Sequence, residues 1–316
     1  MRVSNIEAHE SKFESGMKDV GGQKYSIEDT VTVGNTTIKK IRPKHDTYFY
    51  KEETEKTAIV LHSTVGVLRG DLASLCKRNN KVSVPYLIAR DGTVYELFDP
   101  KYWSYHLGRG AKGGNTNNSK RTIGIELSNM GPLTLVGNKL ETAYSRLGKD
   151  EKPDVYCDIS EVDAYVKVDK PFRGKQYFAS FTDAQYSALY DLIDYLCEEH
   201  NIPRKYLPEA SRFKTFKSSS DAKTFNGICS HVNFRTSGKW DIGPDFKWDA
   251  IIPQEMVFDE VVINPEPEEP VVDESNPVVE APDKTEDLGD VIVDQLEERG
   301  GKWGSLISKI VGLFRR

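Results

Sequence analysis

The sequence lacks the features that mark several large classes of protein. It has no uninterrupted apolar run of the roughly 18 residues that a membrane-spanning helix needs. The first residues, MRVSNIEAHESKFESG, contain no apolar core of a secretory signal peptide. Four cysteines occur and none has the CxxC spacing of a metal or redox motif. We therefore expect synthesis in a cytoplasm, no export by the general route, and free thiols in a reducing compartment.

A strong charge of one sign is also absent from most of the chain. The net charge is −6, but residues 264–301 hold thirteen acidic residues against two basic ones. Residues 302–316 hold four basic residues and no acidic one. The first 263 residues are therefore close to neutral, whereas a nucleic-acid-binding protein is usually basic. We expect no nucleic-acid partner.

The hydrophobic pattern predicts an α/β fold with a central mixed β-sheet flanked by helices. Residues 56–64 (KTAIVLHST) and 122–128 (TIGIELS) have the apolar composition of buried strands. Residues 82–99 indicate a hairpin, because two apolar runs flank an Asp-Gly turn. Thr182 can cap a helix that follows it, with Gln185 at the spacing of a capping box. Alternating strands and helices are typical of this fold class.

Composition divides the chain into four predicted parts. The body is interrupted between about 130 and 178 by a stretch that we expect to be irregular and inserted into the scaffold. Residues 263–301, which follow the body, are rich in proline and acidic residues. They cannot bury a core and should form an extended linker. The predicted parts are an N-terminal extension with a hairpin (1–50), a catalytic domain (51–262), an acidic linker (263–301) and a basic amphipathic helix (302–316).

Three residues that can bind a metal stand in segments far apart in the sequence. His62 ends the first predicted strand, His231 lies in GICSHVNFR, and Asp241 lies in SGKWDIGPDF. Catalytic zinc typically takes three protein ligands of these types and keeps a fourth position for water. Each residue alone is a weak signal, because a single histidine at a strand end is more often a polar surface or capping residue.

Two further residues strengthen this interpretation. Glu126 stands in the middle of the apolar IGIEL, where an ionised carboxylate is costly to bury without a partner or a role. Lys239 precedes Asp241 by two positions, so on an extended segment both side chains project from the same face.

Five motifs together resemble one enzyme family. LHST, YLIARDGTVYELFD, YHLG, IGIEL and SHVNF…GKWDIGPDF occur in this order between about residues 56 and 250. They are similar to the type-2 N-acetylmuramoyl-L-alanine amidases, which share their fold with peptidoglycan recognition proteins and phage amidase-type lysozymes. The resemblance implies a Zn²⁺-dependent enzyme that hydrolyses the amide between N-acetylmuramic acid and L-alanine in peptidoglycan.

The resemblance also implies roles for the residues named above. His62, His231 and Asp241 correspond to the zinc ligands. Glu126 corresponds to the catalytic glutamate, which takes a proton from water and delivers it to the leaving amine. Lys239 corresponds to the lysine that stabilises negative charge on the carbonyl oxygen.

A third group of residues corresponds to the substrate cleft. His106 matches a cleft histidine in a WHAG-like motif, with Tyr105 where an aromatic residue is usual. Trp103 is a further candidate for contact with sugar, although aromatic side chains beside a hairpin are core residues about as often. The chain departs from the family at Val84 and Pro85, where many members have a polar residue close to the zinc.

The last fifteen residues predict a helix that lies in a membrane interface. KWGSLISKIVGLFRR places Trp303, Leu306, Ile310 and Phe314 at helical spacing, among four basic residues. Contact with a membrane or with an anionic bacterial outer membrane follows from this composition. The alternative is a helix that docks on the body of the protein or on a partner.

Together these features fit a bacteriophage endolysin. Such an enzyme waits in the host cytoplasm and acts on the periplasmic cell wall once the inner membrane is breached. A cytoplasmic amidase that recycles muropeptides is an alternative, against which the linker and the helix argue. A non-catalytic peptidoglycan-binding module is a second alternative, although binding-only relatives typically lack the third ligand, which is present here as Asp241.

Deletion of residues 302–316 tests the role of this segment. Burial of its apolar face in a lipid interface would contribute several kcal/mol at roughly 25 cal/mol per Å², and each basic residue about 1 kcal/mol near an anionic surface. We expect the truncated protein to digest purified sacculi normally and to lose binding to anionic vesicles, measured by co-sedimentation at low and high salt. Unchanged vesicle binding with a less stable body would instead identify a docking helix.

Overall fold

The computed structural model describes residues 2–10, 24–147 and 152–253. The predicted acidic linker (263–301) and amphipathic helix (302–316) lie outside these residues. The α-helices are α1 (Val3–Glu10), α3 (Leu68–Leu75), α4 (Asn115–Arg121), α5 (Asp183–Glu199), α6 (Glu209–Arg212) and α7 (Ser219–Thr224). None of these helices combines the length and the apolar character that a membrane span requires.

Seven strands form the central sheet, in the spatial order β1-β2-β5-β4-β6-β3-β12. Its strands are β1 (Tyr25–Val33), β2 (Thr36–Pro43), β3 (Ala58–Ser63), β4 (Tyr86–Ile88), β5 (Val94–Glu96), β6 (Thr122–Leu127) and β12 (Gly227–Ser230). Strands β12, β3, β6 and β4 run parallel, while β5 is antiparallel to β4. The sheet is therefore mixed, and the predicted α/β class is confirmed.

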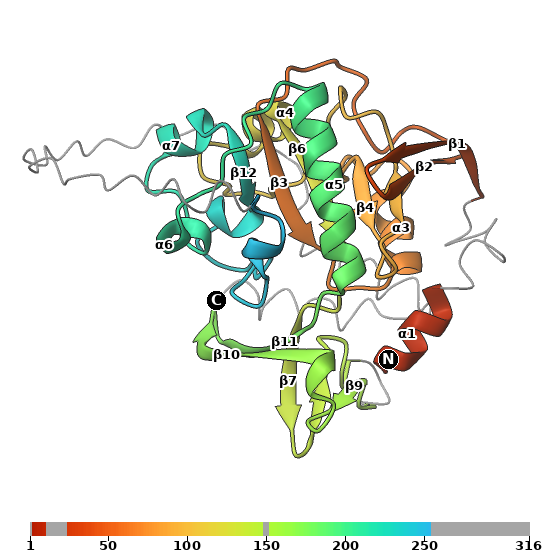
Figure 1. Ribbon diagram of the computed structural model, residues 1–316, viewed down its shortest axis with the longest axis vertical. Coiled ribbons are helices and arrows are strands. Elements are labelled where there is room, and N and C mark those ends of the chain that lie inside the picture. Colours follow the sequence, from red (N-terminus) through yellow and green to blue (C-terminus); the bar gives the residue numbers. More distant parts are fainter. Residues whose placement is uncertain (1, 11–23, 148–151, 254–316) are drawn as a thin grey trace, which may run out of the picture.

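Helix α5 covers one face of this sheet (Figure 1). Its capping box forms as expected, with the Thr182 side chain accepting from the backbone N–H of Gln185. Leucines of α5 pack in one core cluster with Ile59 and Leu61 of β3. Successive side chains of a strand point to opposite faces, so Val60 and His62 face away from α5. The residues that carry chemistry thus lie on the sheet face that α5 leaves uncovered.

The hairpin predicted within the N-terminal extension is part of the sheet. Strands β1 and β2 are antiparallel around a turn at Gly34, whose φ of 54° suits glycine. Strand β2 also pairs in parallel with β5. The hairpin therefore extends the sheet along the edge opposite β12.

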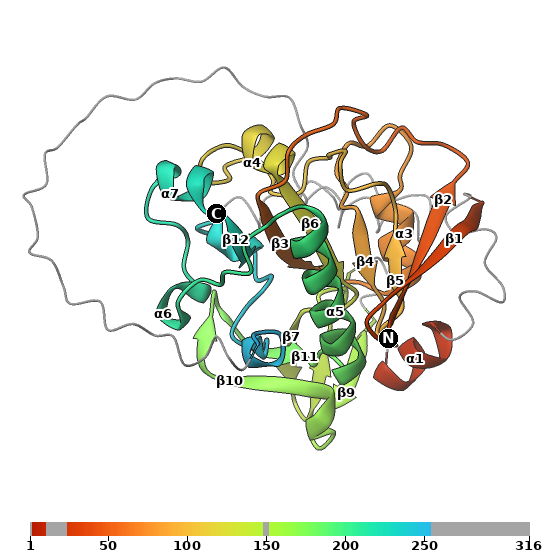
Figure 2. The same ribbon diagram turned by 45° about the horizontal axis from the view of Figure 1, so that its top comes forward.

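Residues between 130 and 178 form a second sheet, so the expectation of irregular structure there is wrong. Its order is β10-β11-β7-β8-β9, with every pair antiparallel. The strands group at one end of α5 in both views (Figures 1 and 2). Apolar and polar residues alternate only briefly in them, at residues 133–135 and 166–168, so the signal for strands is weak. Their bounds are β7 (Pro132–Val136), β8 (Lys139–Glu141), β9 (Val155–Asp158), β10 (Tyr165–Phe172) and β11 (Lys175–Ala179).

Helix α1 joins the two sheets. Ile6 is buried in the core cluster of the second sheet, beside Leu133 and Tyr156. At the end of the helix, the buried Glu10 carboxylate accepts from the backbone N–H of Arg90, which follows β4. Burial raises the pKa of Glu10 to about 7. All four cysteines are free, as the sequence predicts, and all four are buried.

Glu10→Gln should make the stability of the protein less dependent on pH. In the folded state Glu10 stays protonated up to about pH 7, whereas in the unfolded chain its pKa is near the ordinary value of 4.5. Its contribution to stability is therefore present below about pH 4.5 and is lost as the pH rises to about 7. We expect the variant to match the wild type at pH 4 and to gain about 3 kcal/mol in the free energy of unfolding at pH 8, because each unit of pKa difference corresponds to roughly 1.4 kcal/mol.

Urea titrations at the two pH values would measure this difference. Glu28→Gln, a change at a side chain that is 58% exposed, is the control and should leave the pH dependence as it is. A gain of equal size at both pH values in Glu10→Gln would contradict the burial of an ionisable group at this position.

Candidate metal centre and catalytic cleft

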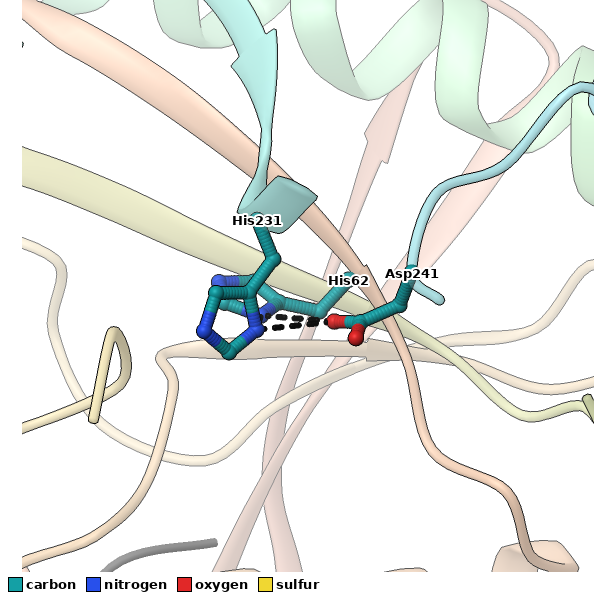
Figure 3. A group of neighbouring side chains, drawn as sticks. All are labelled: His62, His231 and Asp241. Atoms are coloured by element: carbon teal, nitrogen blue, oxygen red, sulfur yellow. Dashed lines mark hydrogen bonds and ion pairs between the residues drawn. The ribbon is translucent and has the colours of Figure 1, made fainter. Parts of the chain in front are cut away.

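The parallel pairing of β12 with β3 places two histidines side by side. Ser230 is paired with Leu61, so the residues that follow, His231 and His62, meet at the same edge of the sheet. Asp241 reaches this edge from the loop after His231. Figure 3 shows the carboxylate of Asp241 directed at both imidazole rings. The three residues that the sequence predicts as metal ligands are thus brought together by the fold.

The three side chains present one nitrogen or oxygen atom each to a common point. His62 Nδ1 and His231 Nδ1 are 3.0 Å apart. Asp241 Oδ2 lies 2.9 Å from His231 Nδ1 and 3.3 Å from His62 Nδ1. Both imidazoles are fully buried, while 12% of the Asp241 side chain is exposed. An ion at this point could therefore still be reached from solvent on the Asp241 side.

A backbone carbonyl sets the tautomer of His231. Its Nε2 lies 3.0 Å from the carbonyl oxygen of Leu107. A carbonyl only accepts, so Nε2 must carry the proton and donate it. In the neutral ring, Nδ1 then keeps its lone pair and is ready to bind a metal.

His106 and Thr122 set the tautomer of His62 in the same way. The Thr122 hydroxyl donates to the carbonyl of Asn118 at 2.7 Å and accepts from His106 Nε2 at 2.9 Å. His106 Nδ1 therefore accepts, and His62 Nε2, at 2.9 Å, donates to it. We call these three side chains the histidine relay. The relay leaves the lone pair of His62 Nδ1 directed at the common point.

The charge states of the three residues suit a divalent cation. Burial, reinforced by His231, lowers the pKa of His62 to about 4. Burial also lowers the pKa of His231, so both rings are neutral at pH 7. For Asp241, burial alone would raise the pKa, but the two histidines outweigh it and hold the pKa well below its usual range. Two neutral imidazoles and one carboxylate are a donor set that fits zinc.

Glu126 lies beside the ligands on the next strand. It is paired with His62 across β6 and β3, so both side chains point to the same face of the sheet. The carboxylate is buried, and its Oε2 has no hydrogen-bond partner within the described residues. Burial, followed by the charge of Asp241, raises the pKa of Glu126 well above its usual range. A buried carboxyl group with a perturbed pKa in a cleft is a candidate for proton transfer.

Glu126, Lys239 and Asp241 line one cleft. One wall comes from the loop that follows β3 and the other from the second sheet and the Lys239 loop. The inserted region therefore forms part of the cleft. The lining residues are Ser63, Thr64, Val65, Glu126, Gly131, Pro132, Phe178, Phe181, Gly238, Lys239, Trp240, Asp241, Ile242, Gly243 and Asp245.

The structure places the three predicted substrate residues elsewhere. Trp103 and Tyr105 are buried in a separate cluster, where the Trp103 ring stacks on the Tyr50 ring with 4.3 Å between the ring centroids. His106 is buried behind His62 and belongs to the histidine relay. None of the three lines the cleft of Glu126 and Lys239. The alternative left open for the two aromatic residues, a place in the core, is the one that the structure supports.

The relay partners of the histidines could not be read from the sequence. Thr122 begins β6 and Leu107 contributes only a backbone carbonyl. A threonine at a strand start and a leucine carbonyl carry no pattern that would single them out. Only the approach of segments about 16 and 124 residues apart in the chain reveals their roles.

Comparison with known proteins identifies one family. The family of N-acetylmuramoyl-L-alanine amidases matches residues 53–244. No curated protein matches the chain.

Similar solved structures include two amidases and AmpDh3. The first is the N-acetylmuramyl-L-alanine amidase AmiD from E. coli, in complex with the substrate anhydro-N-acetylmuramic acid-L-Ala-D-gamma-Glu-L-Lys. Its sequence identity with this chain is 20% and its TM-score is 0.39, and the match covers 64% of this chain and 58% of AmiD. AmpDh3 from Pseudomonas aeruginosa has 14% identity and a TM-score of 0.37, over 64% and 60% of the two chains. The N-acetylmuramoyl-L-alanine amidase LysC from Clostridium intestinale URNW has 13% identity and a TM-score of 0.34, over 66% and 92%. This chain thus spans less than two thirds of AmiD and of AmpDh3.

Thr122→Val tests whether the histidine relay prepares His62 for a metal. Valine keeps the shape of threonine but neither accepts from His106 nor donates to Asn118. We expect zinc affinity, measured by competition with a chelator, to fall about 10-fold, because partners that orient a ligand typically matter to this extent. The loss of buried hydrogen bonds should also cost about 1–3 kcal/mol in stability. Wild-type zinc affinity in this variant would remove the relay from the metal centre.

Proposed function

The chain belongs to the family of N-acetylmuramoyl-L-alanine amidases, and on this basis we propose that it is a zinc-dependent hydrolase of peptidoglycan. The bond cleaved is the amide between N-acetylmuramic acid and L-alanine. One observation carries the proposal: the three metal-binding atoms and the carboxylate of Glu126 meet at one edge of the sheet.

His62, His231 and Asp241 would hold the zinc ion. Bound there, zinc would polarise a water molecule and the substrate carbonyl, with the pKa of the water lowered towards about 7. The residues fit this role because two neutral rings and a carboxylate all present acceptor atoms to one point.

Glu126 moves the proton in the proposed reaction. Its carboxylate takes a proton from the attacking water, whose oxygen forms the new bond to the carbonyl carbon. The same proton then passes to the amide nitrogen as the carbon–nitrogen bond breaks, which releases the peptide with a free L-alanine amino group. The high pKa of the buried Glu126 supports the second transfer, because the carboxyl group holds its proton until the amine accepts it.

Lys239 stabilises the charge that develops on the carbonyl oxygen. It lines the cleft together with Glu126 and Asp241. An ammonium group held near a site that is partly shielded from water stabilises a developing negative charge more strongly than it would in bulk solvent. The position of Lys239 two residues before Asp241 ties its location to that of the ligand.

We propose further that the enzyme is a bacteriophage endolysin that degrades the host cell wall. The acidic composition of residues 263–301 and the basic, apolar composition of residues 302–316 support this role, although both lie outside the described residues. Recycling of muropeptides is the competing role, and the two differ in substrate: sacculi for an endolysin, soluble fragments for a recycling enzyme.

Digestion of purified sacculi, followed by mass spectrometry, tests the proposed activity. We expect peptides with a free N-terminal L-alanine and intact glycan strands, activity lost on metal removal, and activity restored by zinc. Glu126→Gln should keep about one zinc per chain and lose turnover by at least about 100-fold, because it removes only the proton-transfer group. Near-normal turnover in Glu126→Gln, or full activity in metal-stripped protein, would contradict this mechanism. Activity on soluble fragments alone would favour the recycling role.

A further inference from the structure

The turn between β10 and β11 has an unusual residue at its tip. Phe172 is paired with Lys175, and the two residues between them, Arg173 and Gly174, both have positive φ, of 48° and 80°. Two successive positive φ angles are typical of a type I′ turn, where asparagine and glycine are preferred. Arginine is unfavourable at a positive φ. A residue that adopts such a backbone conformation often has a functional side chain, so the contacts of the Arg173 side chain can explain its presence here.

The Arg173 side chain reaches from the second sheet to the loop that carries the third metal ligand. Its Nη1 donates to the carbonyl of Lys239 at 2.5 Å. Its Nη2 donates to the carbonyls of Arg235 at 2.5 Å and Val232 at 3.2 Å. In return, the Trp240 indole N–H donates to the carbonyl of Arg173 at 3.0 Å. Four hydrogen bonds therefore connect the turn with this loop.

The loop runs from His231 to Asp241, and these bonds hold both of its arms: residues 232–235 after His231, and residues 239–240 before Asp241. Val232 follows His231 directly, and Lys239 precedes Asp241 by two residues. The arms also meet each other, because the backbone N–H of Val232 donates to the carbonyl of Asp241 at 2.9 Å. A planar guanidinium can bond several carbonyls at fixed angles, which a lysine ammonium on a flexible stem does less well. One side chain thus fixes the separation of the segments that bear His231 and Asp241.

The turn also packs against the segment just after Asp241. A side-chain carbon added to Gly243 would lie 3.1 Å from Cδ1 of Phe172, so the Phe172 ring contacts this backbone closely. Pro132 and Phe178, from strands of the same sheet, line the cleft beside Lys239 and Asp241. The second sheet therefore touches the cleft at several points, and Arg173 bonds residues at both ends of the loop.

We propose that Arg173 is a positioning residue of the metal centre, through which the inserted sheet holds Asp241 and Lys239 in place against His62 and His231. The inference rests on the proposed zinc site for its effect on metal binding. Its effect on the loop itself is independent of any metal.

Arg173→Asn separates positioning from a merely structural role. Asparagine suits a positive φ better than arginine, so the turn should remain, while the bonds to Val232, Arg235 and Lys239 are lost. Arg146→Asn is the matched control. Arg146 lies in the same inserted region with a φ of 56° and bonds Glu141 at 3.0 Å, away from the ligand loop.

Two measurements compare these variants with the wild type. In chelator competition, we expect zinc affinity to fall about 10-fold or more in Arg173→Asn and to stay unchanged in Arg146→Asn. In metal-free protein, amide exchange should be faster in residues 232–241 of Arg173→Asn alone, most clearly at the N–H of Val232. Arg173→Lys, which keeps the charge but lacks the planar fork, should fall between the wild type and Arg173→Asn in both measurements.

The outcomes distinguish this inference from the proposed function. Equal zinc affinity and equal amide exchange in Arg173→Asn and Arg146→Asn would overturn the positioning role, even if both variants melt at a lower temperature. If the wild type binds no zinc, the proposed function fails. The positioning role of Arg173 is then tested by amide exchange alone. Faster exchange of the loop in Arg173→Asn then supports the positioning role, and unchanged exchange overturns it.

Discussion

The candidate metal centre of this protein depends on three acceptor atoms that face one point. His62 Nδ1, His231 Nδ1 and Asp241 Oδ2 lie between 2.9 and 3.3 Å from one another. Three acceptors so close repel one another unless a cation or a proton lies among them, so the arrangement favours metal binding. The surroundings maintain it, down to Gly124, where an added side-chain carbon would lie 3.2 Å from His106 Nδ1. The glycine leaves space for Val84, whose Cγ1 would lie 2.6 Å from the added carbon, and for His106 behind His62.

The sequence predicts most of this edge because its signals are local and chemical. His62 ends an apolar strand, and Glu126 interrupts another, so each stands out against its neighbours. Parallel strands bring such positions to one edge of a sheet, and the observed pairing of His62 with Glu126 confirms this. The capping box at Thr182 is equally local, and helix α5 begins where it predicts.

The remaining features depend on contacts between distant segments, and no local pattern encodes them. The strands of the second sheet show only brief alternation of apolar and polar residues, at residues 133–135 and 166–168, so residues 130–178 give a weak signal. Trp103 looks like a residue that binds sugar because tryptophan often does, yet it stacks on Tyr50, 53 residues away in the sequence. Arg173 has no motif at all, and its importance is visible only once Lys239 lies beside it.

The hydrogen bonds from Arg173 to the ligand loop have a thermodynamic consequence for strands that contain no ligand. Strand β10 is an edge strand of a small sheet, the kind of element that opens locally at little cost in free energy. Coupling between two sites is reciprocal. If the hairpin orders the loop, then a cation bound at the loop would order the hairpin to the same extent. Part of the binding free energy of the cation would then oppose the fraying of β10. With a cation bound, the resistance of this hairpin to proteases would depend on the metal site as much as on the hairpin itself.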